Sequence, residues 1–441
     1  MHANWSISLI DHRNSDKIQG WNLESPKSGA ESEQDYSDQI RFRGWYLAQQ
    51  GGPGKIKLSH GGVVLADIAA DLPRPEDVTR ARVDNPADRP GKECCGFDLT
   101  LSRRPGPYRL EVSGPGLDGG IMVFDILDLQ CGPYALIGKD RQLFLGGDSN
   151  DSVGQFTERR IVPERSAISW AANFAAMKAW ETEYGMRMSL LIAPAKEEIF
   201  PNYFPFPRAS RTVLDDFRFR FAANNPVVPI HELRAQRQFA YCETDTHWTD
   251  HGATLAAKAV LKHWGMDETI IGELPQEFVS RQRHGDLGVK LEPHRASYQL
   301  VFAKDPDRLL VFDNGVRNQG CIRMWKNPDA PLPNSCLIFG DSFGTNFAQS
   351  LTGVFSQVTY AYRPASFCTT LSGMLNPSHV ILQITQRFLH GSPDRRETIF
   401  DTAATKINSL PDAERQALTR SFFAQADGPF SALISSHLER L

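Results

Sequence analysis

The spacing of apolar residues changes at about residue 130, and this change constrains the fold more than any other feature of the chain. Before it, apolar side chains recur at every second position in short runs, as in Phe97-Asp98-Leu99-Thr100-Leu101, and glycine-rich turns separate the runs. A period of two is typical of strands with one buried face. Residues 1–130 are therefore predicted to form an all-β, sandwich-like accessory domain. Its predicted strands are Lys55–His60, Val63–Ala69, Phe97–Leu101, Tyr108–Val112 and Ile121–Leu127.

After residue 130, helical and strand-like segments alternate. Trp170, Phe174 and Met177 fall at helical spacing, and an apolar run that is typical of a buried strand follows them. This alternation predicts that residues 131–441 form an α/β domain, with a parallel sheet covered by helices on both faces. The predicted strands are Leu190–Ala193, Val227–Ile230, Cys336–Phe339, Val358–Tyr362 and Val380–Ile384. Two further predicted helices are Ala253–Trp264, ending at Gly265, and Phe343–Leu351, ending at Gly353.

Composition excludes several classes of partner. Forty-eight lysines and arginines against 52 aspartates and glutamates give a net charge of −4, so no nucleic acid is expected as a partner. No apolar run approaches the roughly 18 residues that span a membrane. The seven cysteines form no CxxC pair, which argues against a zinc site or a disulfide framework. The first residues lack the basic and apolar regions of a signal peptide, so we expect a cytoplasmic protein.

The tripeptide Gly-Asp-Ser occurs twice, ending at Ser149 and at Ser342, each time after an apolar run. A serine in this position lies at the carboxyl edge of an open α/β sheet, where such folds place their sites. A helical pattern clearly follows only Ser342, and a helix N-terminus can stabilise a developing oxyanion. We therefore predict that Ser342 is a nucleophile and that Ser149, followed by a turn at Asn150–Gly154, belongs to a strand exit.

A serine nucleophile needs a base and a group that orients the base. Asp245 and His247 lie two residues apart, just before a predicted helix, and are the candidates for these roles. Two other interpretations stay open. His247 and His251, at i and i+4 with Asp250 between them, are also compatible with a divalent metal site or with a capped helix start.

These residues carry a resemblance to a known family. Asp245-Thr246-His247-Trp248, followed by Gly252-Ala253 and a later Gly-x-Ser, resembles the SGNH-hydrolase-like domain of alginate O-acetyltransferases, which has a circularly permuted order of catalytic residues. The similarity covers about residues 131–400. This chain has Gly-Asp-Ser where that family often has Gly-Thr-Ser, and Gln386 where a glutamate usually precedes the arginine. The other similar segments are Gly138–Leu145, Ile192–Lys196, Gly285–Leu287 and Val380–Phe388.

The resemblance implies an SGNH-type fold and a triad of Asp245, His247 and Ser342. It implies a serine-dependent O-acetyltransferase that acts on a polysaccharide or glycan precursor through an acyl-enzyme. We expect the backbone N–H of Ser342, helped by Gly344 or Asn346, to stabilise the oxyanion. The alternatives are a carbohydrate O-acetyl esterase with the same triad, an esterase that uses Ser149 with Asp245 and His247, and a non-catalytic glycan-binding or assembly scaffold.

Further expectations concern ligands. We expect no bound cofactor and no metal; acetyl-CoA is a candidate acetyl donor, and polysaccharide-assembly proteins are candidate partners. Trp248, Trp264 and Trp325 either stack on sugar rings or, as we favour, belong to the core; Trp248 is the candidate for substrate contact. Lys196 is either a support for catalysis or a structural lysine with a buried stem, and we favour structure.

Overall fold

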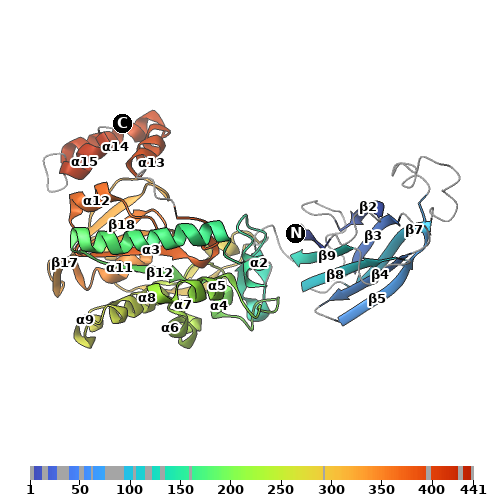
Figure 1. Ribbon diagram of the computed structural model, residues 1–441. Coiled ribbons are helices and arrows are strands. Elements are labelled where there is room, and N and C mark those ends of the chain that lie inside the picture. Colours follow the sequence, from blue (N-terminus) through green and yellow to red (C-terminus); the bar gives the residue numbers. More distant parts are fainter. Residues whose placement is uncertain are drawn as a thin grey trace. The chain divides into compact units, whose positions relative to one another are not determined.

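Two compact units make up the chain in the computed structural model (Figure 1). The first contains Met1–Ser149, Phe204–Phe206 and Leu287–Arg295; the second contains Asn150–Tyr203, Pro207–Asp286 and Ala296–Leu441. The residues that the structure describes are 4–11, 18–26, 39–48, 54–60, 63–74, 94–102, 106–114, 122–129, 135–157, 161–291, 294–393, 399–425 and 431–438.

Two antiparallel sheets form a sandwich in the first unit. One sheet has the strand order β1-β9-β8-β4-β5 and the other β2-β3-β7-β6. Alternate side chains such as Ile56 and Leu58 of β4 pack with Phe42 of β3 and Leu110 of β8 in one core, which confirms the predicted all-β domain. The strands are β1 (Asn4–Asp11), β2 (Ile18–Ser25), β3 (Gln39–Ala48), β4 (Gly54–His60), β5 (Val63–Ala70), β6 (Leu72–Pro73), β7 (Cys94–Ser102), β8 (Gly106–Ser113) and β9 (Met122–Leu129).

A short hairpin follows, in which β10 (Ala135–Ile137) pairs with β11 (Leu143–Leu145). Its residues Ala135 and Leu143 form a small core with Leu287 and Leu291. The domain boundary predicted near residue 130 falls at residues 130–134, outside the described residues, and stays a prediction.

A six-stranded sheet forms the centre of the second unit, in the order β12-β19-β17-β18-β16-β15. The first four strands in that order are parallel, as predicted, and the last two are antiparallel additions at one edge. The strands are β12 (Arg187–Ala193), β15 (Leu310–Asp313), β16 (Ile322–Lys326), β17 (Leu332–Gly340), β18 (Phe355–Tyr362) and β19 (His379–Thr385). A separate hairpin pairs β13 (Phe278–Arg283) with β14 (Ser297–Phe302).

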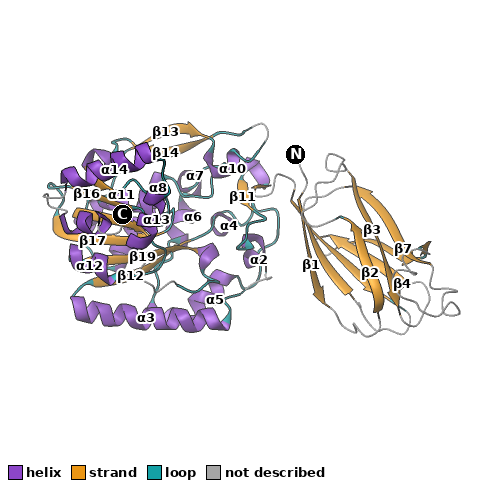
Figure 2. Ribbon diagram, turned by 90° about the horizontal axis from the view of Figure 1, so that it is seen from above, coloured by secondary structure: helices purple, strands orange, loops and turns teal. Residues whose placement is uncertain are grey.

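Helices cover both faces of this sheet (Figure 2). Alternate residues Met188, Leu190 and Ile192 of β12 share a core with Trp170 and Phe174 of α3, which lies on one face. Helices α8 and α11 pack on each other on the opposite face. The predicted α/β fold is therefore confirmed. The helices are α2 (Ser152–Phe156), α3 (Glu164–Tyr184), α4 (Lys196–Ile199), α5 (Val213–Arg220), α6 (Ile230–Ala235), α7 (Arg237–Ala240), α8 (Asp250–His263), α9 (Glu268–Gly272), α10 (Gly285–Gly288), α11 (Gly344–Leu351), α12 (Thr369–Leu375), α13 (Ile399–Asn408), α14 (Asp412–Gln425) and α15 (Ser431–Leu438).

Two predictions for local segments were wrong. The segment Val227–Ile230 is not a strand: Val227 makes a single bridge to Leu191, and α6 begins at Ile230 because Pro226 and Pro229 offer no N–H to a ladder. The segment Asn150–Gly154 is not only a turn, since α2 begins within it and is capped by Asp151.

Helix ends follow the prediction in one case and not in the other. Gly265 has a φ of 67°, the left-handed conformation predicted after α8. Helix α11 instead ends on Thr352 in a right-handed conformation, so Gly353 is not its left-handed cap. Among the helices of the described residues, none has both the length and the apolar character that crossing a membrane requires.

Candidate active site

Four polar residues lie at or just after the carboxyl ends of the four parallel strands of the central sheet. Lys196 follows β12, Ser342 follows β17, Tyr362 ends β18, and Arg387 follows β19. Because parallel strands end at the same edge, these residues share the carboxyl edge of the sheet. This edge is where an open α/β sheet places its ligand site.

Ser342 lies between β17 and α11, in a turn that the fully buried Asp341 holds in place. The Asp341 carboxylate accepts hydrogen bonds from the backbone N–H groups of Phe343 (3.0 Å) and Thr385 (2.6 Å), and from Gln383 Nε2 (3.0 Å). Its backbone carbonyl accepts from the Tyr360 hydroxyl at 2.6 Å. The turn therefore has fixed partners on β18 and β19, and it presents the half-buried Ser342 side chain.

Asp245 and His247 lie in the loop between α7 and α8. Thr249 caps α8 by accepting from the N–H of Gly252 at 3.1 Å. Trp248 joins this loop to the serine turn, because its Nε1 donates to the carbonyl of Phe343 at 3.1 Å. The Asp-x-His loop and the serine turn, 95 residues apart, are thereby locked together.

Asp245, His247 and Ser342 form a continuous chain of hydrogen bonds. His247 Nε2 lies 2.8 Å from Ser342 Oγ, and His247 Nδ1 lies 2.8 Å from Asp245 Oδ1. The same Asp245 oxygen accepts the backbone N–H of His247 at 2.8 Å, which fixes the loop around the carboxylate. The structure thus brings together the three residues that the sequence predicted as a triad, in the geometry that serine catalysis requires.

The charges of the site favour a basic imidazole. Burial opposes protonation of His247, but the hydrogen bond and charge of Asp245, together with the charge of Asp286, raise its pKa above the ordinary 6.5. Burial likewise opposes ionisation of Asp245, but its hydrogen bond to His247 and the charge of His247 lower its pKa to about 2. Asp245 is therefore ionised at neutral pH and supports the positive form of His247.

Three residues of the site were not singled out by the sequence. Tyr362 pairs with Gly340 between β17 and β18, two residues before Ser342, and burial, with the charge of Asp341, raises its pKa. Arg387 lies with its guanidinium carbon 5.9 Å from the Phe343 ring centroid, and its charge opposes protonation of His247. Asp286 lies 3.6 Å from His247 Nδ1. The positions of Tyr362 and Arg387 at predicted strand ends were the available signal.

Lys196 is a buried lysine, 2% exposed, that faces the loop carrying Asp245. Its Nζ donates to the backbone carbonyls of Cys242 (2.5 Å), Glu243 (3.0 Å) and Asp245 (3.3 Å). A buried ammonium with three carbonyl acceptors holds this loop in one conformation. The structural role favoured from the sequence agrees with these contacts.

Gly344 and Asn346, predicted to help the oxyanion, have other partners. The N–H of Gly344 donates to the carbonyl of Asp341 at 2.8 Å. Asn346 Nδ2 donates to Asp250 Oδ1 at 2.7 Å. Both groups therefore serve the local structure of α11 and α8. The backbone N–H of Ser342 stays the predicted oxyanion donor.

The three candidate tryptophans belong to the core. Trp248 is 2%, Trp264 3% and Trp325 0% exposed, so none offers a face to a sugar ring. The core position that we favoured for Trp248 agrees with its contacts, because its ring packs against Phe343 at 5.1 Å between centroids and against Phe347. Its role is to position the loop.

The metal and Ser149 interpretations do not match the geometry. His251 lies on α8, and its Nε2 contacts Gln236 at 2.7 Å. His247 lies in the loop before that helix, so the two histidines do not form an i, i+4 pair of ligands on one helix. In the part of the chain that the structure describes, the side chains close enough to share an ion are Asp245, His247 and Asp286. Ser149 is exposed, and His247 Nε2 is already bonded to Ser342.

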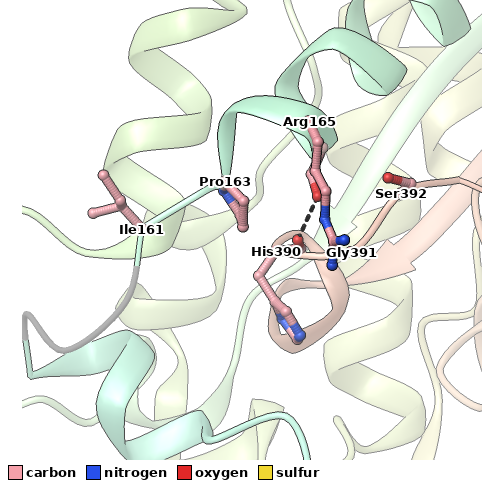
Figure 3. A pocket seen from close by; sticks show the side chains of 7 residues that line it. Ile161, Pro163, Arg165, His390, Gly391 and Ser392 are labelled. Atoms are coloured by element: carbon pink, nitrogen blue, oxygen red, sulfur yellow. Dashed lines mark hydrogen bonds between the residues drawn. The ribbon is translucent and has the colours of Figure 1, made fainter.

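A cavity of about 590 Å³ opens beside the segment that follows Arg387 (Figure 3). Ser166 Oγ donates to the carbonyl of His390 at 2.8 Å, and Trp170 Nε1 donates to that of Gly391 at 3.0 Å. These bonds fix the segment on α3 and so hold Arg387 near the triad. The lining residues are Ile161, Pro163, Arg165, Ser166, His390, Gly391 and Ser392.

The open α/β sheet and the hydrogen-bonded Ser342, His247 and Asp245 at its carboxyl edge define a protein of the serine-hydrolase type. The family described as SGNH hydrolase-like domain, acetyltransferase AlgX, matches residues 137–358, half of the chain. The chain belongs to this family.

Curated relatives match over shorter segments. The probable alginate O-acetylase AlgJ of Pseudomonas fluorescens is 25% identical over 190 residues, which are 41% of this chain and 43% of the relative. The probable alginate O-acetylase AlgJ of Pseudomonas putida is 24% identical over 157 residues, 34% and 38% of the two chains. The chain thus spans less than half the length of these relatives.

Solved structures with distant similarity include two bacterial proteins. The O-acetyltransferase domain of Pseudomonas putida AlgJ has 18% identity and a TM-score of 0.36, covering 66% of this chain and 99% of that one. Bacillus cereus PatB1 has 14% identity and a TM-score of 0.43, covering 58% and 98%.

Proposed function

We propose that the chain is a serine-dependent O-acetyltransferase that modifies a polysaccharide or glycan precursor through an acyl-enzyme on Ser342. The observation that carries this proposal is the hydrogen bond of 2.8 Å between His247 Nε2 and Ser342 Oγ, in a member of the acetyltransferase AlgX family. The relatives named as probable alginate O-acetylases support a polysaccharide as the acceptor.

In the first half of the reaction, His247 removes the hydroxyl proton of Ser342 while Oγ forms a bond to the carbonyl carbon of the acetyl donor. The carbonyl oxygen becomes an oxyanion, which the backbone N–H of Ser342, in the turn just before α11, stabilises. The bond to the leaving group then breaks, and His247 gives that group its proton. An acetyl ester on Ser342 remains.

In the second half, an acceptor hydroxyl gives its proton to His247 and attacks the acetyl carbon. The bond to Ser342 Oγ breaks, and His247 returns the proton to Oγ. Water would give free acetate by the same steps, so transfer requires that the bound acceptor have a high effective concentration at the acyl-enzyme. The carbohydrate O-acetyl esterase with the same triad differs only in this step.

Acetyl-CoA, as a substrate, is the acetyl donor that we propose to test first. A cytoplasmic location and an association with polysaccharide-assembly proteins remain predictions from the sequence. The assay offers acetyl-CoA or an acetyl ester together with candidate glycans, and mass spectrometry follows the acetyl group. Acetylated glycan supports the transferase, and acetate alone with every acceptor makes the protein an esterase.

Separate alanine substitutions of the two Gly-Asp-Ser serines test the assignment of the nucleophile. Ser342→Ala should abolish turnover of p-nitrophenyl acetate, because His247 then has no hydroxyl to activate. The matched control Ser149→Ala removes the same oxygen from an exposed serine and should keep nearly full activity. Equal activity of the two variants would refute the assignment. Loss of mass-detectable acetyl-enzyme in Ser342→Ala alone would support it, and turnover by neither variant nor wild type would favour a non-catalytic scaffold.

A further inference from the structure

Asp286 is a second carboxylate beside the triad. It lies in α10, and its Oδ2 is 3.6 Å from His247 Nδ1. Its Oδ1 accepts the backbone N–H of Thr246 at 2.7 Å, and its Oδ2 accepts the hydroxyl of Thr246. Both oxygens thus accept hydrogen bonds from Thr246, which fixes the carboxyl group beside the imidazole.

The backbone holds Asp286 at this place. Its own N–H donates to Asp245 Oδ2 at 3.3 Å. This bond joins the start of α10 to the loop that carries Asp245. Gly285, just before it, has a φ of 67°, and a Cβ there would lie 2.2 Å from the carbonyl oxygen of Thr244. The close approach of α10 to the Asp245 loop therefore requires glycine at position 285.

Three charges act on the imidazole of His247. Asp245 and Asp286 favour its protonated form, and Arg387 opposes it. Burial and the charge of Asp245 raise the pKa of Asp286, which shows that the two carboxylates interact. Lys196 donates to backbone carbonyls of the same loop.

We propose that Asp286 is a positioning residue that acts through His247: with Asp245 it forms a pair of carboxylates on the Nδ1 side of the ring, and its charge strengthens His247 as the base for Ser342. The inference rests on the proposed function. It assigns to a residue of the Gly285-Asp286-Leu287 segment a role that the triad alone does not contain.

Asp286→Asn tests the charge while keeping an oxygen for the N–H of Thr246. His247 works as a base when neutral, so kcat/KM falls as the pH drops through its pKa. Removing a negative charge 3.6 Å from Nδ1 lowers that pKa. The midpoint of the acid limb for p-nitrophenyl acetate should therefore move down by about one pH unit. The plateau at higher pH should fall in kcat, because the base is weaker, with KM nearly unchanged.

Further variants separate charge from structure. Asp286→Glu keeps the charge and should restore the midpoint, and Glu277→Gln, an exposed charge removed elsewhere, should leave it unchanged. Asp286→Ser also removes the charge, and it replaces Asp286→Asn in the pH-profile measurement if Asp286→Asn does not fold. A lower rate with an unshifted midpoint would overturn the proposal, as would the failure of both neutral variants to fold, because Asp286 would then serve only stability.

Direct titration separates this inference from the proposed function. In a Ser342→Ala background, NMR follows the imidazole signals of His247 with and without Asp286→Asn, and needs no turnover. A lower His247 pKa in the variant supports the role of Asp286 even if no acetyl transfer is found. An equal pKa in both proteins refutes that role even if transfer is observed.

Discussion

Buried charged groups organise this site, and each is satisfied by neighbouring atoms of the chain. The Asp341 carboxylate binds the N–H groups of Phe343 and Thr385 with different oxygens. The threonine that often takes this place in alginate O-acetyltransferases has one side-chain oxygen where aspartate has two. The aspartate thereby joins the serine turn to the end of β19.

Gln386 is a neutral side chain whose two polar atoms are also bonded to neighbouring groups. Its Oε1 accepts the N–H of Ala195 at 3.0 Å, and its Nε2 donates to Glu198 Oε1 at 3.4 Å. A glutamate at position 386 would place a second carboxylate against the fully buried Glu198. Glutamine supplies a donor there instead and avoids repulsion between like charges. The difference from the similar family thus fits its surroundings in this chain.

Lys196→Met should damage both stability and catalysis. The change keeps the buried stem but leaves the carbonyls of Cys242, Glu243 and Asp245 without the ammonium that they bind. Chemical denaturation should show a free energy of unfolding lower by about 3 kcal/mol. Because the loop carries Asp245 and His247, kcat should fall more than KM rises. The control Lys262→Met removes an exposed lysine, and its unfolding free energy should change by less than about 0.5 kcal/mol. Equal effects of the two changes would refute this role.

At the scale of elements, α11 approaches the sheet so closely that its first residue has no space for a side chain. A Cβ on Gly344 would lie 2.5 Å from Tyr360 Cε2 and 3.2 Å from Gln383 Oε1. Tyr360 is buried and holds the carbonyl of Asp341. The glycine after the serine turn is therefore explained by packing, and the position of the start of α11 depends on it.

Gly344→Ala should push α11 away from β18 and disturb Ser342. Overpacking of this kind should lower the free energy of unfolding by about 1–3 kcal/mol and reduce kcat with it. The matched control is Gly272→Ala at the end of α9, where a Cβ would meet nothing within 4 Å. That change should be neutral or stabilising by up to about 1 kcal/mol. Equilibrium denaturation compares the two variants, and a stable, fully active Gly344→Ala protein would contradict the argument.

The elements with strong patterns could be predicted from the sequence, and contact-dependent features could not. The period of apolar residues was enough for β12, β17, β18, β19, α3 and α8. Strand β15 is a short, largely exposed edge strand, and its neighbour β16 has only five residues, so their patterns are weak. Asp286 acquires its place from a contact with Thr246, 40 residues away, which no local spacing indicates. The triad was predictable because its chemistry restricts the residue types, whereas Tyr362 and Arg387 required the strand order.

At the scale of the whole molecule, the described residues of the first compact unit form several separate cores, and two of them bear on the domain boundary. One lies within the β-sandwich, around Phe42 and Leu58. The other joins the β10–β11 hairpin to later parts of the chain, through Leu143 with Leu287 and through Phe144, whose ring is 5.0 Å from that of Phe204. Since Phe204 and Leu287 lie within the sequence of the α/β domain, the hairpin is expected to remain with that domain when the chain is cut. This favours the predicted boundary near residue 130 over a division after Ser149.

Two fragments test this boundary. Residues 131–441 keep the hairpin, and residues 150–441 lose it and uncover Phe204, Leu287 and Leu291. Each buried side chain of that size contributes about 1.5–3 kcal/mol, so the shorter fragment should melt about 10 °C lower in calorimetry. The longer fragment should keep the p-nitrophenyl acetate activity of the full chain, because the triad lies entirely within it. Limited proteolysis of the full chain should yield the same fragment, beginning near residue 131. Equal melting of the two fragments, or cleavage that leaves no stable C-terminal piece, would place the boundary elsewhere.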